Sequence, residues 1–167
     1  IKPEKQYIDG NAQKAAEEIS KSAHLGGITE NDIQLVLNKY GIAYSVIPKL
    51  EKTPIDAASL QMSGYPSIIT THRYNDMSRL IFNILHELGH IQKHMSFEND
   101  NQCSVFVSSE NDYSRDNKEE REANEFAEDM LIPKETWKKM MSTSTKNLSN
   151  QYILRILIGF QHRSMEV

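Results

Sequence analysis

Residues 85–90 read Leu85-His86-Glu87-Leu88-Gly89-His90, and this stretch decides the fold because it fixes both a helix and a metal site. It contains the pattern H-E-x-x-H, in which two histidines lie four residues apart. On an α-helix this spacing places both imidazoles on one face, about one turn apart, where they can bind the same ion. The motif therefore predicts a helix that presents a zinc site.

The residues around the motif favour a long helix with two different faces. Asn75 or Asp76 is expected to cap it, and it is expected to run to about His94. Its aliphatic residues gather on one side, namely Leu80, Ile81, Ile84, Leu88 and Ile91. The opposite side carries Arg79, Asn83, His86 and His90. Histidines that merely packed in a core would not be separated from the aliphatic residues in this way.

Two other residues of this helix have different expected roles. Glu87 lies about 100° round the helix from His86, so its carboxylate is expected to act as a general base without ligating the metal. His94 continues the four-residue series. On a straight helix, however, it would lie about 12 Å along the axis from His86, which disfavours His94 as a third ligand.

A second helix, expected at 119–131, is the best source of the third ligand. Its apolar residues form one arc, made up of Ala123, Phe126, Ala127 and Leu131. Glu120 falls inside that arc, and a carboxylate that faces a core is costly unless it is paired or metal-bound. Glu119, at the edge of the arc, stays an alternative, as does a simple helix-capping role for both glutamates.

The remaining polar residues of this second helix divide into two groups. Asn124 lies one turn beyond Glu120 and is placed to hydrogen-bond a metal-binding residue. Glu122, Glu125 and Asp129 fall on the far side and are expected to form a solvated acidic face. A capping box of Asp116 and Glu119 is expected to begin the helix, which must stop before Pro133.

The rest of the chain predicts a single α+β domain over residues 1–167. Residues 1–40 form a helical pair, with a first helix at 11–24 and a second that begins after a Thr29–Asp32 capping box and ends at Gly41. Residues 41–142 hold the two helices of the site and a small antiparallel or mixed three-stranded sheet. Residues 143–167 are expected to form a C-terminal helical segment.

The strands and the last helices are assigned from local patterns. Segments rich in β-branched residues at 42–47, 55–61 and 66–71 predict the three strands, and a further short strand is possible at Ser104–Val107. Pro133 suits the first turn of a helix through Met141, and Tyr152–Phe160 is expected to be helical.

Composition excludes several classes of protein. The 167 residues carry a net charge of −4, which disfavours direct binding of nucleic acid by this segment. Neither N-terminal helix has a basic face, so the pair is interpreted as an ordinary hairpin and not as a DNA-reading helix-turn-helix. No apolar run is long enough to cross a membrane. The single cysteine, Cys103, disfavours both a disulfide framework and a structural zinc site, and a cytoplasmic location is expected.

Two motifs together resemble the ImmA/IrrE metallopeptidases. The first is the H-E-L-G-H helix at 86–90, and the second is Glu120-Arg121-Glu122-Ala123-Asn124-Glu125-Phe126-Ala127, followed by Leu131-Ile132-Pro133. The resemblance extends from about Tyr40 to Trp137. It implies a minimal zincin-like domain with a gluzincin-like site, in which Glu120 aligns with the third ligand and Asn124 with a residue that hydrogen-bonds a ligand.

The resemblance also implies a function. Members of the family are cytoplasmic proteins of bacteria and their mobile elements that cleave or disable a DNA-binding repressor. The expectation is thus a zinc-dependent endopeptidase, with Zn²⁺ as cofactor and a helix-turn-helix repressor as protein substrate. The chain shows no helix-turn-helix of its own, so it could be one domain of a longer protein.

Several alternatives stay open at this point. The domain could hold zinc yet only sequester a repressor or toxin, although an intact Glu87 argues against a pure binder. The metal could also be a neighbour of zinc such as manganese, because sites of histidine and carboxylate accept several ions. An oxyanion stabiliser is expected, and His72, Tyr74 and His162 have suitable chemistry.

Overall fold

The computed structural model describes residues 3, 5–25, 27–49, 53–62, 64–71, 76–97, 103–109, 117–132 and 138. In this part of the chain the element order is α1 (Asn11–His24), α2 (Glu30–Lys39), β1 (Ala43–Ile47), β2 (Ile55–Met62), β3 (Tyr65–Thr71), α3 (Met77–His94), β4 (Ser104–Ser109) and α4 (Lys118–Leu131). The fold is α+β, as the sequence predicts. The helices expected at 133–141 and 152–160, and the segment 143–167, lie outside the described residues, apart from Lys138.

The sheet is mixed and has four strands in the order β1-β3-β2-β4. β1 pairs parallel to β3, whereas β2 runs antiparallel to both β3 and β4. The segments predicted at 42–47, 55–61 and 66–71 are confirmed as strands, but the three-stranded sheet is wrong by one strand. The additional strand is β4, at the segment that the sequence left as a possible short strand. Its signal is weak because only three consecutive apolar residues, Val105, Phe106 and Val107, lie between flanking serines.

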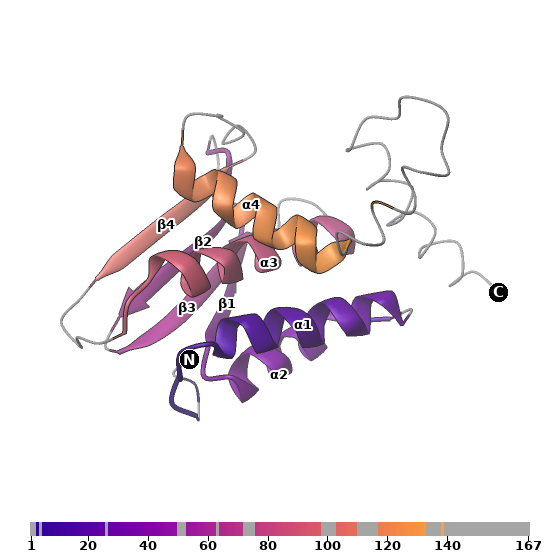
Figure 1. Ribbon diagram of the computed structural model, residues 1–167, viewed down its shortest axis with the longest axis horizontal. Helices are drawn as coiled ribbons and strands as arrows, with labels where there is room; N and C mark the ends of the chain where they lie inside the picture. The colour runs from indigo at the N-terminus through magenta and orange to yellow at the C-terminus, as the bar shows by residue number, and fades with distance from the viewer. Residues whose placement is uncertain are drawn as a thin grey trace.

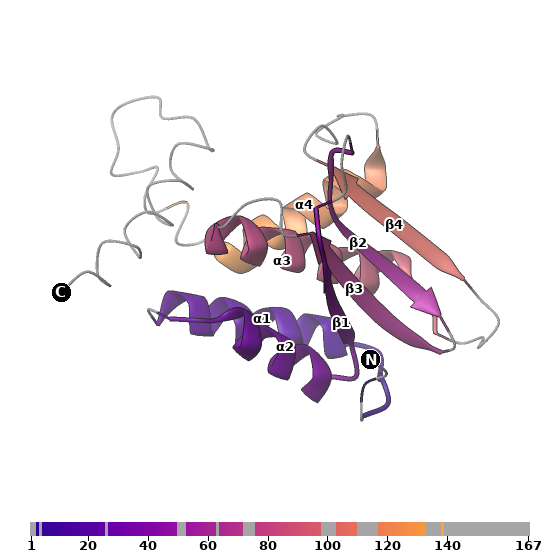
Figure 2. The same ribbon diagram turned by 180° about the vertical axis from the view of Figure 1, so that it is seen from behind.

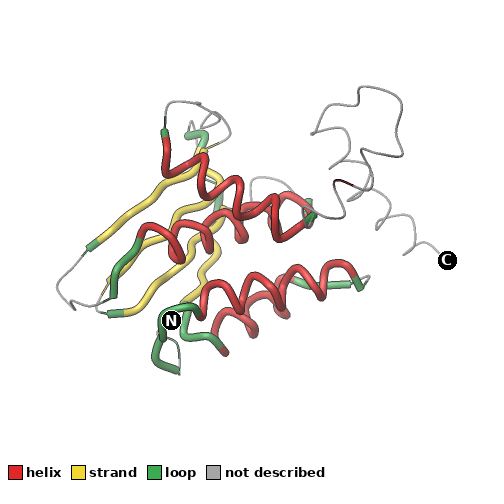
Figure 3. The backbone as a smooth tube through the Cα atoms, viewed as in Figure 1, coloured by secondary structure: helices red, strands yellow, loops and turns green. Residues whose placement is uncertain are grey.

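The helices α3 and α4 lie together across one face of the sheet, while α1 and α2 lie beside them next to β1 (Figures 1 and 2). The tube view separates the strands from this helical layer (Figure 3). α3 is central, since it contacts α1, α4, β2 and β3. Its predicted aliphatic side enters the core, where Ile84 and Leu88 are fully buried. No helix of the described part is both long and apolar enough to pass through a membrane.

The helix boundaries follow from local signals. Thr29 and Asp32 form the predicted capping box at the start of α2. Gly41 ends that helix with a φ of 78°, and a Cβ there would lie 2.6 Å from the backbone nitrogen of Tyr7. Only glycine meets both conditions, because a left-handed backbone and a close approach both exclude a side chain.

The caps of the two site helices are asparagine and aspartate. Asp76 caps α3, and its side chain accepts hydrogen bonds from the backbone N–H groups of Ser78 and Arg79. α4 is capped by Asn117, whose side chain accepts from the N–H groups of Glu119 and Glu120. Asp116, the first residue of the predicted Asp116–Glu119 capping box, lies outside the described residues, and the cap of the helix is Asn117, one residue later than predicted. Its side chain satisfies two of the N–H groups that have no partner within the helix.

A close contact between α3 and α4 depends on Gly89. A Cβ on Gly89 would lie 3.0 Å from the Cα and 3.2 Å from the carbonyl oxygen of Ala123, and also 3.2 Å from the Cβ of Phe126. The first two neighbours are backbone atoms of a packed helix, which cannot rotate away. Glycine at this position therefore lets the two helices approach closely enough to share a site.

Gly89→Ala is expected to push α4 outward by a few tenths of an ångström. Overpacking costs about 1–3 kcal/mol, and the better helix propensity of alanine returns about 1 kcal/mol, so the free energy of unfolding should fall by about 1 kcal/mol. Chemical denaturation of the metal-free protein measures this. An unchanged or higher stability would show that the contact between α3 and α4 accommodates a methyl group without strain.

Candidate metal centre

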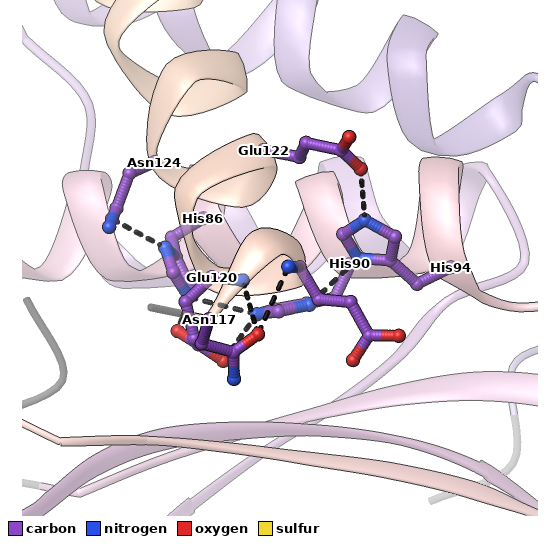
Figure 4. A network of polar contacts seen from close by, with 8 residues as sticks. His86, His90, His94, Asn117, Glu120, Glu122 and Asn124 are labelled. Atoms are coloured by element: carbon purple, nitrogen blue, oxygen red, sulfur yellow. Dashed lines mark hydrogen bonds and ion pairs between the residues drawn. The ribbon is translucent and has the colours of Figure 1, made fainter. Parts of the chain in front are cut away.

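Three buried side chains converge between α3 and α4. His86, His90 and Glu120 offer ligand atoms that all lie within 4.8 Å of one another. His86 is 5% exposed, His90 0% and Glu120 7%. The two histidines come from one face of α3, and Glu120 comes from the first turn of α4 (Figure 4). The structure thus brings together the three residues that the sequence predicts as ligands, whereas Glu119 is exposed.

The distances within this cluster are short. The Nε2 atoms of His86 and His90 lie 3.0 Å apart. Each lies 3.2 Å from a different oxygen of the Glu120 carboxylate. Two nitrogens bound to one tetrahedral zinc at the usual 2.0–2.1 Å would lie about 3.3 Å apart. The donor set of two imidazoles and one carboxylate therefore fits a divalent cation with little rearrangement.

Electrostatics within the cluster favour a cation. Burial would raise the pKa of Glu120, but hydrogen bonds from His86 and His90 and their charges outweigh it and lower the pKa to about 2. Burial likewise opposes the charged form of His86. Its hydrogen bond with Glu120, the negative charges of Glu87 and Glu120 and the hydrogen bond with Asn124 outweigh burial and raise the pKa of His86. The negative charges of Glu87 and Glu120 beside the imidazoles therefore favour a positive charge in this cluster.

Each histidine is held through its other ring nitrogen. His86 Nδ1 lies 2.9 Å from Oδ1 of Asn124, so the structure places Asn124 where the sequence predicts it. His90 Nδ1 lies 3.0 Å from Nδ1 of His94. His94 is therefore not one of the converging ligand atoms, in agreement with the expectation from its axial distance. Figure 4 shows both contacts.

Two contacts near His90 were not anticipated from the sequence. The ring of Phe106, on β4, stacks on His90 with centroids 4.4 Å apart and an angle of 14° between the planes. His94 Nε2 lies 3.1 Å from a carboxylate oxygen of Glu122. Glu122 therefore contacts α3 through His94 although its side chain is 32% exposed, so it is not only part of the solvated acidic face that the sequence predicts. Its position two residues after Glu120 gave no signal of this pairing.

Glu87 occupies an unusual position for a carboxylate. It is 0% exposed, and neither carboxylate oxygen has a hydrogen-bond partner among the described residues. Burial raises the pKa of Glu87. The charge of His86 lowers this pKa, but by less than burial raises it. The hydroxyls of Ser108 and Ser59 lie nearby and also lower it a little, although they do not reach hydrogen-bond geometry with the carboxylate. A buried carboxyl whose pKa is raised toward neutrality suits proton transfer.

The predicted oxyanion stabilisers cannot be placed. His72, Tyr74 and His162 all lie outside the described residues. Their role stays a prediction.

A family comparison matches most of the chain. The model of a peptidase family, described as the IrrE N-terminal-like domain, matches residues 46–154, which is more than half of the 167 residues. The matched region includes β2, β3, β4 and both helices of the site. A search of curated proteins gives no match.

Removing one candidate ligand is expected to abolish stoichiometric metal binding. Glu120→Gln and His86→Ala should each weaken affinity by more than about 100-fold, beyond the 10- to 100-fold typical of losing a residue that only orients a ligand. Glu119→Gln is the matched control, because Glu119 is exposed on the same helical turn. Metal content after dialysis, measured by mass spectrometry, tests this; binding retained by Glu120→Gln would exclude the predicted ligand set.

Glu87→Gln is expected to stabilise the metal-free protein in a pH-dependent way. Folding raises the pKa of Glu87 above its ordinary value of 4.5, so its contribution to stability is present below that value and is lost as pH rises through the folded pKa. Glutamine does not titrate. The variant should therefore be more stable than wild type at neutral pH, and this difference should shrink as the pH falls toward 4.5.

Denaturation curves from acid to neutral pH measure this gain. The matched change Glu125→Gln, at an exposed position of α4, is the control for removing one carboxylate from the surface of the protein. A constant gap between Glu87→Gln and wild type would contradict the assignment of a raised pKa.

Proposed function

This chain belongs to the ImmA/IrrE metallopeptidase family, and on that premise we propose that it is a zinc-dependent endopeptidase whose metal is held by His86, His90 and Glu120. The observation that carries the proposal is the convergence of these three buried ligand atoms within 4.8 Å. Two neutral imidazoles and one carboxylate are the protein ligands of a well-known class of catalytic zinc sites, which keep a position open for water.

The reaction would divide between the cation and Glu87. When bound, the cation would supply Lewis acidity to the attacking water and the scissile carbonyl. The Glu87 carboxylate accepts the proton of that water and then delivers it to the nitrogen of the leaving amine. Its burial supports this role, because a carboxylate without hydrogen-bond partners keeps its basicity and a dry site strengthens the electrostatic interactions within it.

The remaining residues of the site hold and orient the two histidine ligands. Asn124 accepts the Nδ1 proton of His86, which leaves Nε2 of that ring free to ligate. Phe106 stacks on His90 and fixes the plane of its ring. These contacts come from α4 and β4, so the site is held from two sides by rigid elements.

The edge of the sheet supports an extended peptide substrate. β4 is the outer strand of the order β1-β3-β2-β4, and in the described part of the chain it pairs with β2 alone. Its residue Phe106 stacks on His90, so this outer strand contacts the candidate site. A peptide added to this edge would hydrogen-bond through its backbone, and its scissile bond would lie near the metal.

The substrate that we propose is a DNA-binding repressor of the helix-turn-helix type. Support for it comes from the family alone. The net charge of −4 agrees with a protein that acts on such a regulator and not on nucleic acid itself. A cytoplasmic location belongs to the same proposal.

Glu87→Gln is expected to abolish cleavage while leaving the metal bound. The loss in kcat/KM should be at least about 10²-fold, since general-base catalysis contributes about 10²–10⁴-fold. Purified wild type and Glu87→Gln, both zinc-loaded, are incubated with candidate repressors, and fragments are identified by mass spectrometry. Glu125→Gln is the control and should cleave as wild type does.

The same experiment separates the enzyme from a module that only sequesters its partner. Such a module would bind the repressor with equal affinity in both forms and give no fragments with either. Equal cleavage by both forms would show that Glu87 is not the base. Manganese-loaded protein tests the metal, because activity restored by manganese and not by zinc would overturn the assignment of zinc.

A further inference from the structure

His90 is connected to the far end of the site by a chain of hydrogen bonds. His90 Nδ1 lies 3.0 Å from His94 Nδ1, and His94 Nε2 lies 3.1 Å from Oε2 of Glu122 (Figure 4). The His94 side chain is 7% exposed and that of Glu122 is 32% exposed. The chain therefore begins at a buried candidate ligand and ends at a carboxylate in contact with solvent.

The groups at the two ends of this chain of hydrogen bonds decide which atom donates and which accepts in each bond. A histidine that ligates through Nε2 carries its proton on Nδ1, so His90 must donate from that atom. His94 Nδ1 must then accept, which leaves the proton of a neutral His94 on Nε2. Glu122, when ionised, can only accept, and it lies where this Nε2–H points. All three groups are thus satisfied in one arrangement.

Packing and neighbouring charges hold this chain of hydrogen bonds in place. Phe106 lies against both imidazoles, with centroids 4.4 Å from His90 and 5.7 Å from His94. Lys93 Nζ donates to the backbone carbonyl of Glu122 at 2.9 Å. Lys118 Nζ lies 3.6 Å from the second carboxylate oxygen of Glu122, so Oε2 stays directed at His94.

We propose that His94 and Glu122 are positioning residues of the metal site, which fix the tautomer and orientation of His90 and thereby set the metal affinity. The inference rests on the proposed metal site at His86, His90 and Glu120. His94 does for His90 what Asn124 does for His86, namely accept the proton from Nδ1. It is not itself a ligand, because both of its ring nitrogens are engaged away from the convergent Nε2 atoms.

The test measures zinc affinity by chelator competition in four variants. His94→Phe keeps an aromatic ring against Phe106 but removes the acceptor, and it should weaken zinc binding about 10- to 100-fold. His94→Gln offers an amide oxygen to His90 and should restore part of the loss. Glu122→Ala should weaken binding by less, since His94 remains. Glu125→Gln, an exposed neighbour on α4, should bind as wild type does.

The double variant His94→Phe/Glu122→Ala examines whether the two residues act as one chain. Its affinity should equal that of His94→Phe alone, because Glu122 acts only through His94. Cobalt-loaded protein gives a second readout, since its d–d bands report ligand geometry; they should shift in His94→Phe and return toward wild type in His94→Gln. A loss of folding alone would not be rescued by glutamine.

The outcomes distinguish this inference from the proposed function. Wild-type protein that binds no zinc would overturn both. Zinc bound by wild type and equally well by His94→Phe would overturn only the positioning role. Losses that multiply in the double variant would show that Glu122 acts independently of His94 and would break the chain at its second link.

Discussion

The close contact between α3 and α4 is the constraint on which the site depends. Gly89 lies between His86 and His90 in the motif, and a Cβ there would come within 3.0 Å of Ala123. Because Ala123 follows Glu120 by three residues, the same contact sets how far the carboxylate reaches over the two imidazoles. Small residues at this contact thus let the two helices approach closely enough for Glu120 to reach both imidazoles, and a larger residue there would move α4 and its carboxylate outward.

This cluster concentrates charge in a place where charge is costly. Glu87 and Glu120 are both buried. Glu120 pairs with His86 and His90, whereas the Glu87 carboxylate has no hydrogen-bond partner among the described residues. The two carboxylates consequently have opposite pKa shifts, with that of Glu120 lowered and that of Glu87 raised. Two carboxylates whose pKa values are shifted in opposite directions suit different tasks. Glu120 suits the role of an ionised ligand, and Glu87 that of a group that gains and loses a proton.

Sequence patterns predicted the parts of the fold that depend on periodicity and local chemistry. The two faces of α3, the inward direction of Glu120 and the Thr29 cap all follow from spacing along one element. What escaped prediction depends on contacts between elements. The fourth strand is stabilised by pairing with β2, and the cap of α4 is Asn117 where a capping box pattern pointed one residue earlier. The pairing of Glu122 with His94 was not predicted because the two residues lie on different helices.

The third histidine of the series shows why spacing alone does not assign a role. His86, His90 and His94 lie on one face of α3 at equal intervals. They extend over about 12 Å of the helix, too far for all three to bind a single ion. His90 turns its Nε2 toward His86 and its Nδ1 toward His94, so the middle residue has one nitrogen for each neighbour. An imidazole has only these two nitrogens. A regular series on a helix can therefore supply two ligands and one acceptor, and α4 supplies an anionic group at each end, Glu120 for the ligands and Glu122 for the acceptor.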